Sequence, residues 1–253
     1  MNRVPHIIAL YWVIKIAATT LGETGADMFS MTWDLGYGAT IGIFMALFLA
    51  SFGIKLAAKG YHPVLYWLTF TTSAIVGTAM SDFIDRTLEL GYAVGSLLLV
   101  LLLLSVLAAW YRSERSIQVE TITTPRAEIF YWLAFLVANT LGTAAGDFLA
   151  DDLELGFVTS AVGISAVLVV LALLHYLTRA PRMLLFWLAF VLTRPFGATF
   201  GDFLTKPSEE GGIAFGTVGA SIVFGGILVA AIARETQLER RRAATPGPVG
   251  PDR

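Results

Sequence analysis

The segment TLGETGAD, residues 20–27, ends a long apolar run and places two carboxylates, Glu23 and Asp27, one helical turn apart. Its pattern returns as VGTAMSD (76–82), LGTAAGD (141–147) and FGATFGD (196–202). The final aspartates are Asp27, Asp82, Asp147 and Asp202, spaced by 55, 65 and 55 residues. A motif that recurs at nearly even spacing is typical of tandem structural repeats.

The agreement between the four copies extends beyond the motif and needs no gaps. An aromatic residue followed by tryptophan begins sixteen residues before each aspartate, and a glycine lies five residues before it. An acid follows the aspartate after seven residues, and a glycine follows after nine. These positions hold Trp12, Trp67, Trp132 and Trp187; Gly22, Gly77, Gly142 and Gly197; Asp34, Glu89, Glu154 and Glu209; and Gly36, Gly91, Gly156 and Gly211. The chain is therefore predicted to consist of four tandem two-helix units.

The composition indicates a membrane protein. Of 253 residues, 56% are hydrophobic and 14% are charged, and the mean hydropathy is +0.72. Soluble domains carry about 25% charged residues. Cysteine is absent from the sequence, which excludes disulfides, thiolate metal sites and cysteine nucleophiles. The first apolar segment is expected to be a retained helix, because it contains Lys15 and Glu23 and lacks a convincing signal-peptide cleavage site.

A spanning helix needs about 20 mostly apolar residues. Eight segments qualify: about 7–27, 37–57, 63–82, 92–111, 128–147, 157–177, 183–202 and 213–233. We expect an all-α polytopic membrane protein with a single transmembrane domain over 1–234 and repeats at about 7–59, 62–112, 127–179 and 182–234. Since each unit crosses the membrane twice, successive units run parallel, with pseudo-fourfold or pseudo-twofold symmetry about the membrane normal. The charged, Pro/Gly-rich segment 235–253 is expected to be a disordered cytoplasmic tail.

Basic residues mark the cytoplasmic side of membrane proteins. In an eight-helix arrangement one side receives Arg3, Lys55, Lys59, Arg112, Arg115, Arg126, Arg179, Arg182, Arg234 and Arg240–Arg242. The opposite loops hold many acids but only two bases, Arg86 and Lys206. Both termini are therefore predicted to be cytoplasmic, and the acidic outer face would concentrate cations.

The pieces YW…TLGETGAD, YW…VGTAMSDF, YW…LGTAAGDF and FW…FGATFGDF resemble a family of bacterial inner-membrane proteins. That family consists of four tandem copies of a two-helix repeat without an assigned function. The resemblance covers nearly the whole chain to about Ala233. The fourth copy departs from the pattern, because Arg194-Pro195 lies inside its helix and a Gly-Gly pair replaces glycine-aromatic. The resemblance implies the architecture and a multi-pass location in the bacterial inner membrane.

Two neighbouring stripes run along the first helix of each unit. Positions 9, 5 and 1 before the aspartate are small, which favours close helix packing in lipid. Positions 8 and 4 before it and the aspartate itself form a polar stripe, because residues four apart share a helical face. Besides the aspartates, this stripe holds Thr19 and Glu23; Ala74 and Thr78; Asn139 and Thr143; and Arg194 and Ala198. Polar groups at this depth should face the bundle or water.

Around a common centre, Asp27, Asp82, Asp147 and Asp202 would meet at one level. Carboxylate oxygens suit hard divalent cations, so a bound divalent cation is one expectation. The competing interpretation is that each aspartate caps a short outer helix. The later acids are expected in solvated turns, and the repeated tryptophans are expected to be anchors at the membrane interface.

Three ionisable residues break the fourfold pattern: Lys15, Glu23 and Arg194. Lys15 is expected to extend its amine towards the interface. Arg194 lies about 12 Å from Asp202 along its helix and is too deep for that. An unpaired arginine in the membrane would cost several kcal/mol. We therefore predict that Arg194 pairs with Glu23, or else with Asp27, and that Pro195 kinks the helix.

The leading functional hypothesis is a transporter or channel for a small cation, a divalent metal ion or one coupled to protons. Its pathway would pass Asp27, Asp82, Asp147, Asp202 and Glu23, with Thr19, Thr78, Asn139, Thr143, Arg194 and Lys15 as a secondary polar set. One alternative is a carrier of a small organic or anionic solute that binds Arg194. Another is a non-transport scaffold or sensor subunit.

An enzyme is not expected, because metalloprotease, serine-nucleophile and phosphate-loop motifs are absent from the sequence. The expected partners are membrane lipid and the cation, with no nucleic acid and no organic cofactor. Homo-oligomerisation is left open.

Overall fold

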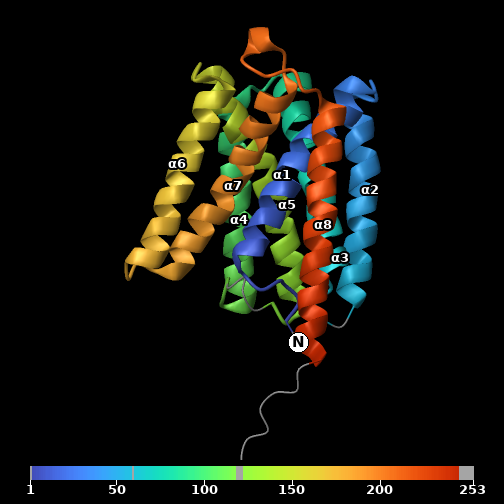
Figure 1. Ribbon diagram of the computed structural model, residues 1–253, viewed down its shortest axis with the longest axis vertical. Helices are drawn as coiled ribbons and strands as arrows, with labels where there is room; N and C mark the ends of the chain where they lie inside the picture. The colour runs from blue at the N-terminus through green and yellow to red at the C-terminus, as the bar shows by residue number, and fades with distance from the viewer. Residues whose placement is uncertain (1, 59, 118–121, 245–253) are drawn as a thin grey trace, which may run out of the picture.

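A computed structural model describes residues 2–58, 60–117 and 122–244. Over these residues the fold is all-helical, as predicted, with eight long helices (Figure 1). They are α1 (Ala9–Asp27), α2 (Gly36–Ala57), α3 (Pro63–Asp82), α4 (Tyr92–Glu114), α5 (Pro125–Asp147), α6 (Gly156–Leu177), α7 (Arg182–Thr205) and α8 (Thr217–Ala244). The π-helical turns η1 (Met28–Thr32), η2 (Phe83–Thr87) and η3 (Phe148–Asp152) extend α1, α3 and α5. A 3₁₀ turn, η4 (Ser208–Glu210), follows α7.

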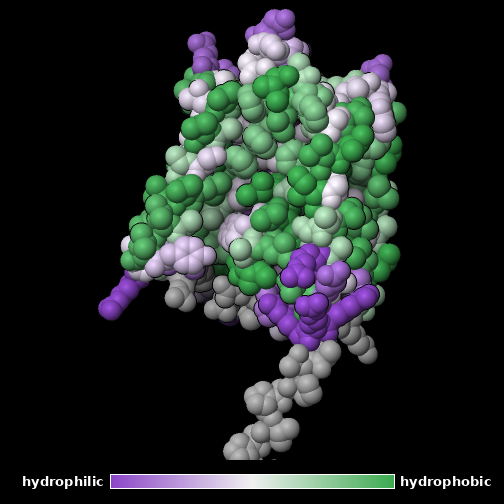
Figure 2. Space-filling view, in the orientation of Figure 1, coloured by the Kyte–Doolittle hydropathy of each residue, from purple (hydrophilic) through white to green (hydrophobic). Residues whose placement is uncertain are grey.

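The protein is a polytopic membrane protein. Seven helices, α2 to α8, are long and apolar enough to cross a membrane. The central part of the visible face is apolar, and hydrophilic residues gather at its two ends (Figure 2). Eight spans were expected, but α1 falls below the composition expected of a span because Lys15 and Glu23 reduce its hydropathy. Since α1 packs against α3, α7 and α8, it needs little lipid-compatible surface of its own.

The eight helices form two concentric rings. The inner ring is closed, because α1 packs against α3, α3 against α5, α5 against α7 and α7 against α1. Each outer helix packs against the inner helix of the following repeat: α2 on α3, α4 on α5 and α6 on α7. The last outer helix, α8, returns to α1. This cyclic order gives the fourfold arrangement, and it interlocks the repeats so that none is packed alone.

Small residues bring the inner helices together, as the sequence predicted. The glycine five residues before the aspartate receives a side chain from the neighbouring inner helix, eight residues before the aspartate there. A Cβ added to Gly22 would lie 2.6 Å from the Cβ of Ala74, and one added to Gly77 would lie 2.7 Å from that of Asn139. Gly142 meets Arg194 and Gly197 meets Thr19 in the same way. One type of contact therefore holds all four inner interfaces.

The turn that follows each inner helix has the same backbone conformation in all four repeats, but in the fourth repeat it occurs later in the sequence. Asp34, Glu89 and Glu154 are exposed and have φ between 54° and 55°, and each is followed two residues later by a glycine with φ of 72–73°. In the fourth repeat this pair is Ala214 and Gly216, five residues later than the ungapped alignment predicted. That alignment is therefore wrong after Asp202, because the last turn contains five additional residues.

The tryptophans were expected at the membrane interface, and for two of them this is wrong. Trp67 and Trp132 are 0% and 1% exposed. The Trp132 ring packs against Phe48 and Phe52 of α2, and Trp67 Nε1 donates a hydrogen bond of 2.6 Å to Glu235 Oε2 of α8. The inner helices are covered by outer ones, so these rings fill the space between helices.

The two ends of the bundle differ in charge. The end that carries the N-terminus and the end of α8 is called here the basic end (Figure 1). The exposed residues Arg112, Arg115, Arg126 and Arg179 lie there, in or next to the ends of α4, α5 and α6. The opposite end, with Asp34, Glu89, Glu154, Glu209 and Glu210, is called the acidic end. Lys59 lies outside the described residues.

The segment 235–253 was expected to be disordered, but α8 continues through Ala244. Glu235 is buried and accepts hydrogen bonds from Trp67 and Tyr61, which fix this part of the helix to the bundle. Residues 245–253 lie outside the described part.

The close contact at Gly77 can be tested by enlarging it. Gly77→Leu is expected to destabilise the protein by about 1–3 kcal/mol, the usual cost of overpacking. Thermal unfolding in detergent measures this as a lower Tm. Gly42→Leu on α2 is the matched control, because nothing lies within 4 Å of a Cβ added there. An equal Tm for both variants would contradict the importance of the contact.

Candidate functional site

The inner ring encloses five successive layers of side chains, one helical turn apart. The layers are Tyr11, Tyr66, Tyr131 and Phe186; Lys15, Phe70, Phe135 and Phe190; Thr19, Ala74, Asn139 and Arg194; Glu23, Thr78, Thr143 and Ala198; and Asp27, Asp82, Asp147 and Asp202. All of these residues except Phe186 are buried. The layers change from aromatic towards the basic end to acidic towards the acidic end.

The structure brings the predicted acids together. Carboxylate oxygens of Glu23, Asp27 and Asp202 lie within 4.8 Å of one another. Asp82 and Asp147 are buried at the same position of α3 and α5 in the closed inner ring. These five residues are called the acidic cluster. Their convergence follows from the ring, since each inner helix contributes the same position.

The interpretation of the aspartates as helix caps is wrong. Asp27, Asp82 and Asp147 precede π-helical turns with α-helical backbone angles, and none makes a side-chain capping hydrogen bond. Asp202 lies inside α7. Because the helix continues through each aspartate, the backbone amides that follow already have helical partners, and the carboxylates remain directed to the ring.

Two cations beside the acidic cluster were missed as site residues. Lys206 Nζ lies 3.3 Å from Asp27 Oδ2 and 3.4 Å from Asp202 Oδ1. Arg86 Nε lies 3.3 Å from Asp82 Oδ1. Both bases were expected in loops, although each lies four residues after a repeat aspartate and so on the same helical face. That spacing is the signal that could have found them.

Lys206 remains charged at this site. Burial disfavours the ammonium form, but the carboxylates of Asp202 and Asp27 outweigh that effect and raise the pKa of Lys206 above its ordinary value. With Arg86 and Arg194, three bases face five acids, so the group has two excess negative charges when all are ionised. Within the described residues no ion pair involves Asp147.

The predicted pair between Arg194 and Glu23 is confirmed. Arg194 Nη1 lies 3.2 Å from Glu23 Oε2, and both side chains are buried. The same oxygen accepts hydrogen bonds from Thr78, at 3.1 Å, and from Thr143, at 3.4 Å. Arg194 Nη2 also donates to Thr78 and to the Ala74 carbonyl. The arginine is therefore bound by groups from α1 and α3, and the glycine at 142 leaves room for its stem.

Lys15 does not extend to the interface, and that expectation is wrong. It is 1% exposed, and its Nζ donates a hydrogen bond of 2.6 Å to the Phe190 carbonyl. The amine also lies over the Phe190 ring, 3.0 Å from the centroid. Lys15 occupies the ring position that is phenylalanine in the other repeats, and its neighbours close the route to the surface.

The remaining polar residues are satisfied within the ring. Asn139 Nδ2 donates to Ser73 Oγ at 3.0 Å, and Thr19 Oγ1 donates to the Ile16 carbonyl at 3.0 Å. Below them, Phe70, Phe135 and Phe190 pack edge to face, with centroids 4.6–5.4 Å apart. This aromatic layer closes the axis between the acidic cluster and the basic end.

The fold and its buried charges define a helical membrane protein of four tandem two-helix repeats. The family model described as a Repeat of Unknown Function (DUF347) matches residues 10–61, 65–116, 130–180 and 185–241. The chain belongs to this family, and the resemblance proposed from the four motifs is confirmed. No curated protein and no solved structure matches the chain.

The Arg194–Glu23 pair can be tested by a double-mutant cycle. Arg194→Met leaves a buried carboxylate unpaired and is expected to cost about 3–5 kcal/mol of unfolding free energy. Glu23→Gln with Arg194→Met should recover part of this, with a coupling of about 1–3 kcal/mol. Denaturant titration in mixed micelles measures all four proteins. Additive effects of the two changes would rule out the pair as a stabilising contact.

Proposed function

We propose that this protein transports a small cation, a divalent metal ion or one coupled to protons, through the acidic cluster. The observation that carries the proposal is the approach of the Glu23, Asp27 and Asp202 carboxylate oxygens to within 4.8 Å of one another in a buried site. Hard divalent cations bind several such oxygens at once. When all of these groups are ionised, the five acids outnumber the three bases, so the site has the net negative charge that favours a cation.

Lys206 suggests how the cation enters. Its ammonium bridges Asp27 and Asp202, so it occupies the place that a cation with those ligands would take. Its side chain is 16% exposed and lies just beyond α7, at the acidic end. An arriving ion can therefore displace Lys206 into the adjoining turn, and the ammonium can return when the ion leaves. The exchange keeps a positive charge beside Asp27 and Asp202 in both states.

Asp147 has a separate role in this proposal. Within the described residues it is the cluster acid without an ion pair or a hydrogen bond to a base. It can therefore take up a proton or complete the coordination of the cation. The aromatic layer of Phe70, Phe135 and Phe190 blocks the axis below. A carrier that changes conformation agrees with this better than an open channel does.

The charge distribution argues against the anionic-solute alternative. Arg194, its proposed binding charge, is paired with Glu23 and bound by Thr78. An anion would have to replace Glu23 within a cluster that is already negative. We also propose a location in the bacterial inner membrane with both termini in the cytoplasm. The bases that gather at the basic end, which carries the N-terminus, support this orientation. The acidic cluster then lies towards the outer face.

Transport can be measured with the purified protein in liposomes. Mn²⁺ entry, followed by calcein quenching, is expected to fall about tenfold or more for Asp27→Asn and Asp147→Asn. Each change removes a carboxylate whose interaction with each unit of cation charge at about 4 Å amounts to about 4 kcal/mol at an effective dielectric constant near 20. Asp34→Asn, an exposed turn residue, is the control. Normal entry with both cluster variants, at equal reconstitution, would reject the site.

Removing Lys206 is expected to strengthen cation binding, whereas removing a cluster carboxylate weakens it. Lys206→Met removes the ammonium that competes with the ion, so the Kd for Mn²⁺ is expected to decrease by about tenfold, equivalent to about 1.4 kcal/mol. Isothermal titration calorimetry on detergent-purified protein measures this. Arg112→Met, an exposed change at the basic end, should leave the Kd unaltered. Weaker binding by Lys206→Met would contradict the displacement step.

A further inference from the structure

One position near the basic end of each outer helix fixes that helix to the inner ring in three repeats. It lies 19 residues after the positive-φ glycine that precedes the helix, and it holds Lys55, Trp110, His175 and Glu235. Lys55 pairs with Glu128 of α5. Trp110 packs edge to face on Tyr131 of α5, and Glu235 accepts hydrogen bonds from Trp67 and Tyr61. All three residues are buried.

His175 of α6 is the exception, because it is exposed. The neighbouring residues Tyr176 and Leu177 are 81% and 75% exposed. At the basic end α6 and the beginning of α7 lean away together from the rest of the bundle (Figure 1). Trp12 of α1, whose counterparts Trp67 and Trp132 are covered by outer helices, faces the resulting space. The fourfold packing is thus open at one of four positions.

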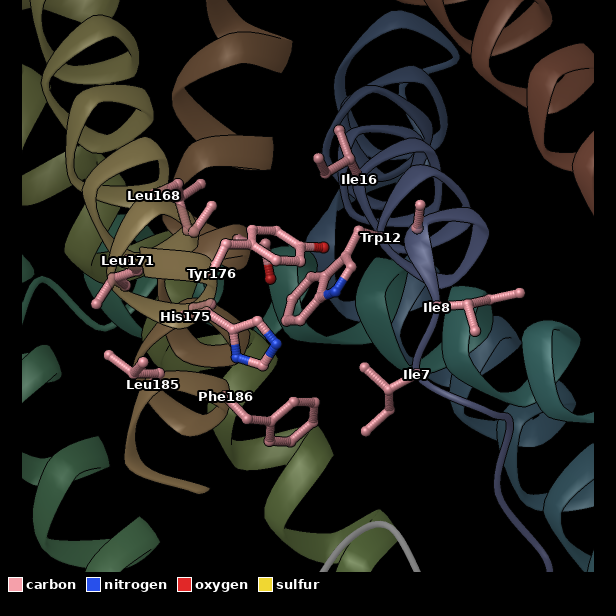
Figure 3. Close-up of a pocket in the computed structure, with 14 residues that line it drawn as sticks. Ile7, Ile8, Trp12, Ile16, Leu168, Leu171, His175, Tyr176, Leu185 and Phe186 are labelled. Atoms are coloured by element: carbon pink, nitrogen blue, oxygen red, sulfur yellow. The ribbon is translucent and has the colours of Figure 1, made fainter. Parts of the chain in front are cut away.

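The opening is a groove of about 410 Å³ between α1, α6 and α7. Its walls include Ile16, Leu168, Leu171 and Phe186. The rings of Trp12, Phe186, His175 and Tyr176 turn towards one another, and the Tyr176 hydroxyl and the His175 ring point into the apolar space (Figure 3). This volume is within the usual range of ligand pockets, about 300–1,000 Å³. Apolar walls together with the polar groups of His175 and Tyr176 suit a ligand with an apolar chain and a polar head.

The charges around the groove select an anionic head. The segments that line it, residues 7–16, 168–176 and 185–193, contain no aspartate or glutamate. They contain two bases, Lys15 and His175, and four more lie next to them in the sequence: Arg3, His6, Arg179 and Arg182. Arg3 is paired with Glu128, and Lys15 binds a carbonyl. Arg179 lies two residues beyond the end of α6 and close to His175 in the sequence. Its side chain is exposed and can therefore bind a phosphate.

We propose that this groove binds one anionic phospholipid. An acyl chain lies between Trp12, Leu168 and Leu171, and the phosphate meets His175 and Arg179 at the basic end. Basic residues beside a membrane attract anionic lipids, and basic pockets between spanning helices bind their headgroups. The bound chain supplies the contacts that Lys55, Trp110 and Glu235 make in the other repeats. The proposal does not depend on the transported substrate.

Native mass spectrometry of the purified full chain tests this with two probes, dioleoyl phosphatidylglycerol and dioleoyl phosphatidylcholine. The wild-type protein is expected to retain one phosphatidylglycerol with a preference of at least about fivefold, the effect of one basic residue near the lipid surface. Ala189→Trp fills the groove and should abolish this retained lipid. Ala109→Trp, on an exposed part of α4, is the matched control and should keep it.

The headgroup contact is tested with His175→Gln/Arg179→Gln, which changes only exposed residues. Its preference for phosphatidylglycerol should fall to about that for phosphatidylcholine, while the Tm without lipid stays unchanged. Equal lipid retention by Ala189→Trp and the wild-type protein would overturn the proposal. So would equal retention of the two lipids by the wild-type protein, or a protein dimer in place of the lipid-bound monomer.

Discussion

Close approach of the four inner helices at one glycine position is the contact on which the rest of the structure depends. At Gly22, Gly77, Gly142 and Gly197 the neighbouring helix inserts a side chain where any Cβ would collide. Lipid tails are as apolar as helix surfaces, so association in the membrane depends on such packing. The contact also sets the rotation of each inner helix about its own axis. When the stripe of small residues lies at the interface, the adjacent polar stripe must face the axis of the ring. The buried layers follow from that rotation.

The charges on the axis are compatible with the membrane because they compensate one another across repeats. Glu23 occurs only in the first repeat and Arg194 only in the fourth, yet ring closure makes α1 and α7 neighbours and brings the two side chains to 3.2 Å. Lys206 similarly joins Asp27 of α1 to Asp202 of α7. Among the four interfaces of the inner ring, within the described residues, the seam between the first and last repeats is the one that ion pairs cross. Residues that occur in single repeats, such as Glu23 and Arg194, have given this interface ion pairs that the other interfaces of the inner ring lack within the described residues.

In the outer ring, too, the four repeats share one contact position, and one repeat departs from it. Lys55, Trp110 and Glu235 occupy equivalent positions but use an ion pair, an aromatic contact and hydrogen bonds. The position is therefore maintained by geometry, and its chemistry is free to change. His175 has the same place but no such contact, and a groove opens beside it. This groove and the acidic cluster both adjoin the seam between α1 and α7, at opposite ends of the bundle.

The sequence by itself determined the repeats, the helical class, the facing of the polar stripe and the Arg194–Glu23 pair, because these follow from periodicity and from the cost of an unpaired charge in lipid. It did not reveal Lys206 and Arg86 as partners of the aspartates, the burial of Trp67, Trp132 and Lys15, or the shift of the last turn. The burial of Lys15 depended on its contact with Phe190 of α7, and that of Trp67 and Trp132 on which outer helix covers which inner one. Only the tertiary structure decided this covering, because the second helix of each repeat packs on the first helix of the following repeat. A periodic sequence pattern specifies which face of a helix is buried, but it does not specify which neighbouring helix covers that face.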